Sequence, residues 1–455
     1  FSDAPTALID LEYRFAGFTF ARSDLGFVTE SWWETRWTRT WAIDPAKPGS
    51  SPKLMTDRSA QDRYADPGAL VTVGDGRGRE VVLLTADGKK AYLAGEGASD
   101  QGDRPFLDRI DLATGRKERL WRSAAPYYES VRAVVDPAGR TIVTQRESVK
   151  EPPNFFLRNL TNRTERQLTT FTDPAPQFAS IEPQLIRYRR ADGVQLSARL
   201  FLPAGYTPSQ GPLPFLVWAY PDEFRDASAA SQVIGSPFRF ARPGGPIGDH
   251  LLLVTQGYGV LDRPSMAIIG EGDAQPNDTY IEQLVASAKA AVDAIVDMGV
   301  ADPKRIAVGG HSYGGFMTAN LLAHSDLFRA GIARSAAYNR TLTPFGFQSE
   351  NRTFWEARDT YMRMSPFAHA DQLKEPLLMI HGAEDPNTAS YPMQSERMFA
   401  ALKATGGRAR LVFLPGEGHV YLARESVGHA LWEMTSWLER HLTPARGDTT
   451  AVPDQ

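Results

Sequence analysis

Cysteine is absent from all 455 residues of the sequence. Its absence excludes disulfide bonds, thiolate metal sites and a cysteine nucleophile, but an exported protein can also lack disulfides, so no compartment follows. Long hydrophobic runs are missing too, because the longest apolar stretches, such as 251–254, are strand-sized and too short to span a membrane. The formal net charge of -4 gives no electrostatic footprint for nucleic acid or for an anionic membrane surface.

Two further absences concern cofactors and the start of the chain. No ligand residues cluster at metal spacing and no glycine-rich loop could cradle phosphates, so the sequence predicts no metal and no organic cofactor. The chain starts at Phe1 without an initiator Met or a leader, which indicates a processed chain or a fragment. What is present, 42% hydrophobic and 23% charged residues, is typical of a globular protein with two or more domains.

Residues 1–177 contain short apolar stretches separated by turn residues. Trp33, Trp37 and Trp41 alternate along one run, which predicts one face of a half-buried strand. A weak repeat of strand, tight turn and strand follows at 42–45, 109–116 and 158–163. Its spacing fits four-stranded blades with one insertion. We therefore expect an all-β, partial β-propeller of about three blades whose N-terminal blades are absent, with a β-sandwich as the alternative.

From Ile181 the pattern changes to near-continuous apolar strands that alternate with helical stretches. This alternation predicts a mostly parallel, doubly wound sheet with helices on both faces, over residues 178–443. Residues 444–455 are polar and without periodicity, and we expect a flexible tail there. The expected strands are 186–189, 195–202, 214–220, 251–254, 258–261, 305–308, 330–333, 377–380 and 410–414, and the expected helices are 280–298, 316–324, 391–405 and 426–441.

A Gly-x-Ser-x-Gly motif lies at residues 310–314, between the apolar run 305–308 and the helical stretch that starts at Phe316. Strand, sharp turn and helix in this order are typical of a nucleophile elbow, in which a strained turn exposes a serine hydroxyl. Ser312 is therefore the candidate nucleophile. The alternative is an ordinary glycine-rich turn before a helix, since the pentapeptide alone is a weak signal.

The loops after two later strands supply candidate partners for Ser312. In an α/β-hydrolase the acid and then the histidine follow the serine, each after a strand. Glu384 and Asp385 follow the strand at 377–380, and His419 is the one histidine on a loop after the last strand. His419 would take the proton of the serine hydroxyl and the acid would orient its imidazole. The backbone N–H of Tyr313 is a candidate oxyanion donor, because it begins the helix after the nucleophile.

Several motifs in this half resemble the prolyl oligopeptidase family of serine peptidases, and most of all its glutamyl endopeptidase-like branch. They are Gly309–Phe316, Ala333–Ser335, Pro344–Phe347, Met364–Pro366, His381–Gly382 with Asp385, and Met393–Arg397. The resemblance covers about residues 181–442. It implies an N-terminal β-propeller, and it favours Asp385 over Glu384 as the acid, with His381 in a structural role.

The resemblance also implies further site residues. Tyr220 matches the tyrosine whose hydroxyl serves the family as a second oxyanion donor, and Arg340 lies where the family builds its first specificity pocket. Tyr338, Asn387 and Phe224 are further candidate substrate contacts. Two departures stand out. Val420 replaces a glycine that many relatives have after the histidine, and Asn387 replaces an arginine that holds the substrate in prolyl oligopeptidases proper.

The main functional hypothesis is a serine peptidase that cleaves short peptides after Glu or Asp through an acyl-enzyme. A bidentate arginine is the usual partner for a carboxylate in a partly dry pocket. The alternatives are an esterase or acylaminoacyl-type hydrolase, and a propeller binding protein with an inactive hydrolase domain. The expected partners are peptides and a missing N-terminal propeller segment, and not nucleic acid or membrane. The family resemblance favours a periplasmic or secreted bacterial protein, with a cytoplasmic location as the alternative.

Overall fold

The computed structural model describes residues 6–242 and 249–443, and the tail expected at 444–455 lies outside them. The chain divides into two compact units. Unit 1 comprises residues 1–176 and 231–241, and unit 2 comprises 177–230 and 242–455. The first division falls beside the boundary expected at 177. The segment 231–241 carries no compositional signal of its own, and sequence reasoning left it in the hydrolase domain.

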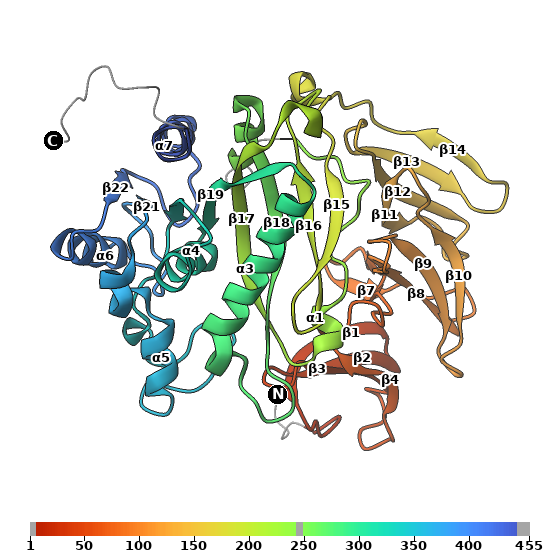
Figure 1. The fold of residues 1–455 in the computed structure, drawn as a ribbon. Coiled ribbons are helices and arrows are strands. Elements are labelled where there is room, and N and C mark those ends of the chain that lie inside the picture. The colour runs from red at the N-terminus through yellow and green to blue at the C-terminus, as the bar shows by residue number, and fades with distance from the viewer. Residues whose placement is uncertain (1–5, 243–248, 444–455) are drawn as a thin grey trace. The chain divides into compact units, whose positions relative to one another are not determined.

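The described part of unit 1 is built of three consecutive four-stranded antiparallel sheets (Figure 1). The first contains β1 (Arg14–Arg22), β2 (Leu25–Trp32), β3 (Trp37–Ile43) and β4 (Lys53–Ser59); the second contains β5 (Ala69–Leu70), β8 (Lys90–Gly95), β9 (Phe106–Asp111) and β10 (Lys117–Arg122); the third contains β11 (Tyr128–Val134), β12 (Thr141–Glu147), β13 (Asn154–Asn159) and β14 (Thr164–Gln167). A hairpin of β6 (Thr72–Gly74) and β7 (Glu80–Val82) is inserted in the second sheet, after its first strand.

The weak sequence repeat marks the same place in all three sheets, the turn between the third and the fourth strand. In each turn a side-chain oxygen accepts backbone N–H groups from residues just downstream. Asp44 Oδ1 binds Ala46 N, Asp111 Oδ1 binds two such groups, and Asn159 Oδ1 binds two as well. This bonding explains why Asp or Asn recurs there.

One aromatic expectation for unit 1 is wrong. Trp37 and Trp41 lie on β3, but Trp33 lies in the turn that joins β2 to β3. The chain reverses there with Arg36 at a φ of 62°, and the Arg36 guanidinium covers the Trp33 ring at 3.6 Å. A period-two pattern continued across a hairpin turn, and periodicity alone could not reveal the turn.

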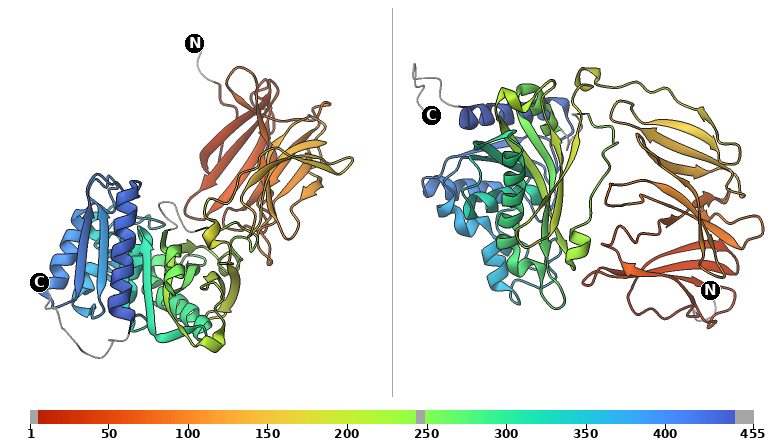
Figure 2. Two further views of the ribbon diagram at one scale, coloured as in Figure 1. Left: turned by 90° about the horizontal axis from the view of Figure 1, so that it is seen from above. Right: turned by 45° about the vertical axis from the view of Figure 1, so that its right-hand side comes forward.

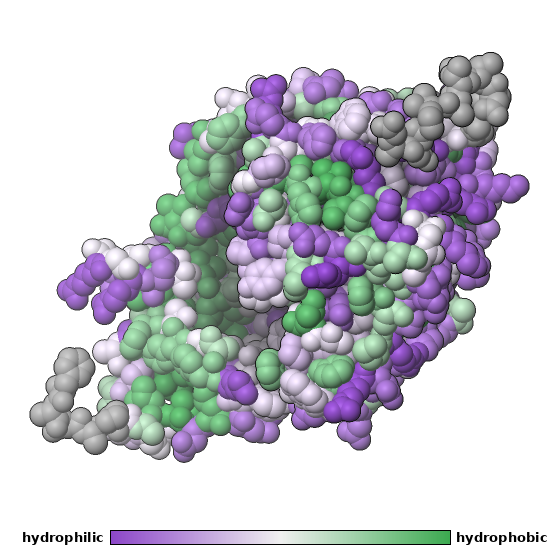
Figure 3. All heavy atoms as spheres, turned by 90° about the vertical axis from the view of Figure 1, so that its left-hand side faces the viewer, coloured by the Kyte–Doolittle hydropathy of each residue, from purple (hydrophilic) through white to green (hydrophobic). Residues whose placement is uncertain are grey.

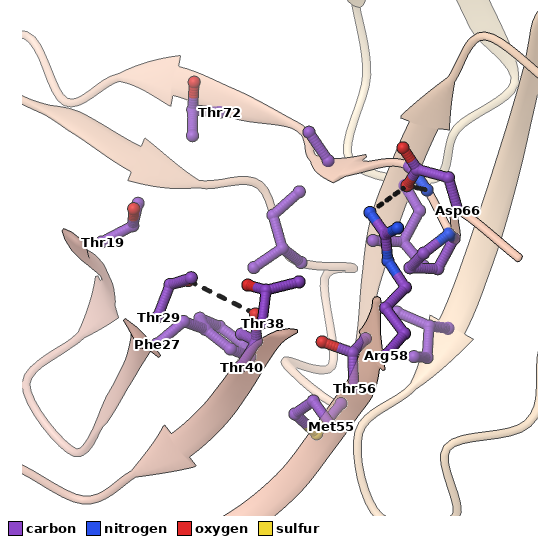
Figure 4. A pocket seen from close by; sticks show the side chains of 16 residues that line it. Thr19, Phe27, Thr29, Thr38, Thr40, Met55, Thr56, Arg58, Asp66 and Thr72 are labelled. Carbon is purple, nitrogen blue, oxygen red and sulfur yellow. Dashed lines mark hydrogen bonds and ion pairs between the residues drawn. The ribbon is translucent and has the colours of Figure 1, made fainter. Parts of the chain in front are cut away.

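Unit 1 holds a pocket of about 430 Å³ between its first two sheets (Figure 4). Threonines of the first sheet line one side of it, and apolar side chains of both sheets, among them Phe27, Leu93 and Ile110, line the rest. Arg58 and Asp66 form an ion pair at 3.1 Å in its wall. The hydroxyls of Thr29 and Thr40 bond to each other at 3.3 Å, so part of the polar lining is satisfied within the protein.

Unit 2 is organised around one eight-stranded sheet with the order β15-β16-β18-β17-β19-β20-β21-β22. Antiparallel pairing joins β15, β16 and β18, and every later neighbouring pair is parallel. The strands are β15 (Gln184–Arg189), β16 (Gln195–Phe201), β17 (Leu213–Phe224), β18 (Gly259–Ile269), β19 (Ala301–His311), β20 (Ala330–Arg334), β21 (Leu377–Gly382) and β22 (Ala409–Leu414).

Helices run along this sheet (Figure 2). They pack on it because their apolar faces and the nearly all-apolar strands bury each other; α3 and α4 contact the central strands and each other, and α7 contacts β19, β20 and β21. The α-helices are α1 (Ala227–Ala230), α3 (Tyr280–Asp297), α4 (Tyr313–His324), α5 (Arg358–Met364), α6 (Met393–Ala404) and α7 (Arg424–Leu442); the 3-10 helices are η1 (Pro176–Phe178), η2 (Pro208–Gln210), η3 (Asp249–Gln256), η4 (Pro276–Thr279), η5 (Arg340–Leu342) and η6 (Pro366–Gln372).

The strand expected at 251–254 is wrong, because these residues form part of η3. Leu251, Leu253 and Val254 are buried. A short apolar run is compatible with a buried strand and with a buried helical turn, and its sequence cannot separate the two. The next strand begins only at Gly259, after a turn at Gly257 with a φ of 87°.

The fold class is confirmed: an all-β region of propeller type precedes an α/β-hydrolase domain. In the described residues, no helix combines the length and the apolar character that a membrane crossing requires. On the face drawn in Figure 3, hydrophobic side chains reach the surface among hydrophilic ones. The number of blades in the whole protein stays a prediction.

Candidate active site

Ser312 lies between the end of β19 and the first residue of α4 and has a φ of 57° and a ψ of -117°. This conformation is strained for a residue with a side chain. Its N–H donates to the carbonyl of Arg334 on β20 at 2.8 Å, and its own carbonyl accepts from Gly315 and Phe316 at 3.0 and 3.1 Å. Backbone hydrogen bonds on both sides therefore hold the strained turn.

Close packing explains the glycines around Ser312. A Cβ atom on Gly310 would lie 2.4 Å from the carbonyl carbon of Gly314, and one on Gly314 would lie 2.3 Å from the oxygen of Ala219 on β17. Strand and helix approach this closely only because neither residue has a side chain. The turn at Ser312 thus has the strained, closely packed geometry that is typical of a nucleophile elbow, and the role of Ser312 as nucleophile stays a prediction.

The candidate acid and base meet on the loops after β21 and β22. His419 Nδ1 lies 2.8 Å from Asp385 Oδ2. Because an ionised carboxylate only accepts hydrogen bonds, this nitrogen carries the proton and Nε2 keeps its lone pair. The ring of His419 lies 5.0 Å from that of His311, the residue before Ser312. No hydrogen bond joins Ser312 Oγ to His419 among the described residues, which is common for a serine site without substrate.

Asp385 is 3% exposed and is surrounded by donors. Its Oδ2 accepts from His419, from His381 Nε2 at 3.1 Å and from Ser390 Oγ at 3.2 Å, and Oδ1 accepts from the N–H of Asn387. Burial alone would raise the pKa of this carboxyl, but the hydrogen bonds from His381 and His419 lower it well below its usual value. Glu384, the competing acid, is exposed and bonds only through its backbone N–H to Glu417 O.

The two candidate oxyanion donors, Tyr313 and Tyr220, lie close to each other. The N–H of Tyr313 has no acceptor among the described residues, as expected for the first turn of a helix. The ring of Tyr220 lies 5.7 Å from that of Tyr313, and its hydroxyl accepts a hydrogen bond from Gln348 Nε2 at 3.3 Å, which leaves its own proton available. The side chain of Tyr313 is held in place because its hydroxyl donates to Glu223 Oε1 at 2.7 Å.

Arg340 is buried behind this turn at 2% exposure. Its guanidinium lies over the rings of Phe316, Phe347 and Tyr313, at 4.1, 4.4 and 5.4 Å. In the described residues no carboxylate lies within 4 Å of it, and its Nε and the buried hydroxyl of Tyr280 have no hydrogen-bond partner. Burial lowers the pKa of Arg340, and the charge of Glu223, beyond ion-pair distance, opposes this shift. A buried cation without a direct ion pair is the least usual feature of the site.

The three remaining candidate substrate contacts lie in different environments. The amide nitrogen of Asn387 lies 3.5 Å from His419 Nε2, so this side chain stands beside the base. Tyr338 is fully buried in the core and Phe224 packs against that core from the end of β17. Their roles as substrate contacts stay predictions.

Sequence reasoning missed Ser390 and Gln348, and it gave His381 only a general structural role. Ser390 lies 3.2 Å from both Asp385 Oδ2 and His419 Nδ1. Neither Ser390 nor Gln348 belongs to a motif, and both reach the site through loops whose course only the fold determines. His381 stands next to a recognisable acid loop, so its position was the one available signal. Among the described residues no group of His, Asp or Glu could hold a metal ion.

Fold and site together define the class: an α/β-hydrolase whose serine, acid and histidine follow one another in the order of serine hydrolases. The family model for the prolyl oligopeptidase family matches residues 278–445, which include all three side chains. Residues 278–445 are therefore a domain of this family.

The relatives agree with this assignment. The protein named "Probable glutamyl endopeptidase, chloroplastic" of Arabidopsis thaliana is 48% identical over 468 residues, which cover 100% of this chain and 48% of that protein. Its namesake in Oryza sativa subsp. japonica is also 48% identical, over 99% of this chain and 50% of its own length. The chain thus spans about half the length of the curated relatives it matches. Both names say chloroplastic and both relatives are plant proteins, whereas the sequence favoured a bacterial one, and the compartment stays a prediction.

A solved puromycin-hydrolyzing peptidase of Mycobacterium tuberculosis has the same fold. It superposes with a TM-score of 0.64 at 20% identity, over 94% of this chain and 62% of that one. The likeness extends over both units of this chain and supports the fold alone.

The tight elbow gives a prediction about stability. Replacing Gly314 with Ala forces the new methyl group into Ala219 O, and we expect the free energy of unfolding to fall by about 1–3 kcal/mol. Gly428 on the exposed face of α7 has open space around it, so Gly428→Ala should raise that free energy by about 0.5–1 kcal/mol. Urea unfolding of both variants measures the difference, and equal effects would contradict the close packing.

Proposed function

We propose that this chain carries the catalytic domain of a serine peptidase, with Ser312 as nucleophile, His419 as general base and acid, and Asp385 as the orienting acid. The observation that supports it best is the 2.8 Å bond from His419 Nδ1 to a buried Asp385, next to a serine held in a strained elbow. The bond places the proton of the neutral imidazole on Nδ1 and so leaves the lone pair of His419 Nε2 to accept a proton.

Catalysis would proceed through an acyl-enzyme. His419 Nε2 takes the proton of Ser312 as Oγ attacks the carbonyl carbon of the scissile peptide bond. Asp385 stabilises the imidazolium that forms. When the C–N bond breaks, His419 gives the proton to the leaving amine. Water then attacks the ester carbonyl while His419 takes its proton, and His419 returns this proton to Ser312 Oγ as the ester bond breaks.

The negative oxygen of the tetrahedral intermediate would be bound by the N–H of Tyr313 and the hydroxyl of Tyr220. Both donors are in place before the reaction, since Tyr313 is tied to Glu223 and Tyr220 to Gln348. Preorganised donors of this kind supply a large part of the rate enhancement in acyl transfer, about 3–4 kcal/mol for one donor.

We further propose that the residue before the scissile bond is Glu or Asp, and that Arg340 binds its carboxylate. Arg340 lies against the ring of Tyr313, the residue after the proposed nucleophile, and forms no ion pair with a carboxylate of the described residues. A buried guanidinium with an unpaired Nε is electrostatically incomplete, and a substrate carboxylate would complete it. The names of the two plant relatives support the same preference.

An esterase or acylaminoacyl-type hydrolase is the alternative, because the triad chemistry is common to all three. A binding protein with an inactive hydrolase domain is less well supported, since the acid, base and elbow are all kept with their hydrogen bonds.

A fluorophosphonate probe tests the triad. We expect it to label the native protein and to leave Ser312→Ala unlabelled, because the phosphorus reacts with the activated Oγ. His419→Ala should lower the labelling rate by about 10³-fold or more. Ser325→Ala, at the other end of α4, is the matched control and should label like the native protein. Undiminished labelling of Ser312→Ala would refute the assignment.

Matched peptides that differ only in Glu or Gln before the scissile bond test the acidic pocket. We expect kcat/KM to favour Glu by about 10²-fold, and Arg340→Met to remove most of that preference. Arg340→Lys should recover part of it, because Lys keeps the charge but loses the bidentate geometry. Arg305→Met, which breaks a surface pair with Asp302, is the control. Equal rates for the Glu and Gln peptides with the native protein would exclude an acidic pocket.

A further inference from the structure

Two imidazoles, and not one, donate to the same oxygen of Asp385. His419 Nδ1 reaches Oδ2 from the loop after β22, and His381 Nε2 reaches it at 3.1 Å from the end of β21. His381 is 0% exposed, so it contacts neither solvent nor substrate. The proposed mechanism uses only His419, which leaves a fully buried titratable side chain without an assigned role.

The neighbours of His381 fix its tautomer. Its Nε2 faces a carboxylate oxygen and therefore carries the proton, so Nδ1 of the neutral ring is an acceptor. Ser395 Oγ lies 2.7 Å from that Nδ1 and donates to it. Ser395 is itself 1% exposed, on the first turn of α6. A relay of hydroxyl, imidazole and carboxylate thus runs from α6 to the acid.

The backbone around this relay leaves the acid little freedom. A Cβ atom on Gly382 would lie 2.0 Å from the oxygen of Gly418, the residue before His419. The N–H of Glu384 donates to Glu417 O at 2.9 Å, and that of Ala383 donates to Leu414 O at 2.9 Å. The loops of acid and base are therefore joined directly, and His381, together with Ser390 and the N–H of Asn387, limits the rotation of the carboxylate.

We propose that His381, held by Ser395 as the Nε2–H tautomer, is a positioning residue that clamps the Asp385 carboxylate for His419. The inference rests on the proposed triad. It assigns His381 two effects. The clamp keeps Oδ2 aimed at His419, and it divides the negative charge of Asp385 between two imidazoles.

The sharing of the Asp385 charge between two imidazoles predicts the direction in which the pH profile shifts when His381 is replaced. If His381 no longer donates, Asp385 interacts more strongly with His419 and favours the cationic form of that ring. A base must be neutral to act, so the acid limb of the pH profile moves to higher pH. The other titratable or charged groups that face the cluster are His311 from β19, Arg334 from β20, and Tyr421 and Tyr338, and they stay the same in every variant.

The test compares kcat/KM as a function of pH for His381→Leu, His381→Gln and the native protein. We expect His381→Leu to lower kcat about tenfold with little change in KM, and to move the acid limb up by about 0.5 pH unit or more. His381→Gln keeps an N–H near the position of Nε2, so the acid limb of its pH profile should lie at the same pH as that of the native protein. His250→Leu is the control, since His250 is another buried imidazole with an aspartate partner, Asp262 at 2.9 Å, outside the triad. It should leave the limb unchanged.

An acid limb that does not move in a folded His381→Leu protein would overturn the proposal, and so would an equal shift in His250→Leu. If His381→Leu fails to fold, Ser395→Ala decides, because it releases Nδ1 and should move the limb in the same direction by a smaller amount; no shift there would count against the clamp.

A measurement on the resting protein separates this inference from the peptidase assignment. Proton NMR should show one downfield imidazole N–H signal that is lost in His381→Leu and another that is lost in His419→Ala, while the signal of the His250–Asp262 pair stays in both variants. If the native protein neither labels nor cleaves but both signals are present, the proposed function fails and the clamp stands. If the protein is active and the His381 signal is absent, the clamp fails and the proposed function stands.

Discussion

The close approach of β19 and α4 at Gly310 and Gly314 is the constraint on which the site depends. A single methyl group at either position would overlap backbone atoms within 2.4 Å, so the turn exists only while both residues are glycine. The strained conformation of Ser312 is held by the hydrogen bond from its N–H to Arg334 O on β20 and by the first turn of α4. Everything else in the site is placed relative to this fixed point, since β17 and β20 flank β19 in the sheet and β21 lies beside β20.

The electrostatics of the site follow from burial. The carboxylate of Asp385 is stable inside the protein because four hydrogen bonds replace its water, and the same bonds orient the base. One set of contacts therefore keeps the acid ionised and sets the geometry of His419. The N–H of Tyr313 and the hydroxyl of Tyr220 complete the arrangement as donors that need not move during the reaction.

Sequence patterns predicted the parallel half of the sheet well, and they placed Asp385 and His419 on two loops that the structure brings together, because both follow from the local order of strand and loop. Apolar runs such as 305–308 and 377–380 become strands, and the residues after them lie at one edge of the sheet. The sequence repeat at Asp44, Asp111 and Asn159 corresponds to a structural repeat, because each of these side chains bonds to the backbone of its own turn. The strand predicted at 251–254 was wrong because length and hydrophobicity do not distinguish a strand from a 3-10 helical turn. The partners of Asp385 from α6 and from the loop at 387–390 could not be predicted, since they depend on tertiary placement.

Two buried arginines of the hydrolase domain differ in how the fold balances their charge. Arg334 is 0% exposed, and its Nη1 donates to both carboxylate oxygens of Asp249 at 2.7 and 2.9 Å, so its charge is balanced within the fold. Arg340 is almost as buried, but it lies among aromatic rings that offer cation–π attraction, and the charge of Glu223 reaches it only from beyond ion-pair distance. An unbalanced buried charge costs stability by several kcal/mol, and a fold built for stability alone would pair Arg340 or replace it. The cost is understandable if the missing carboxylate arrives with the substrate, which is why the acidic pocket is proposed at Arg340 and not at Arg334.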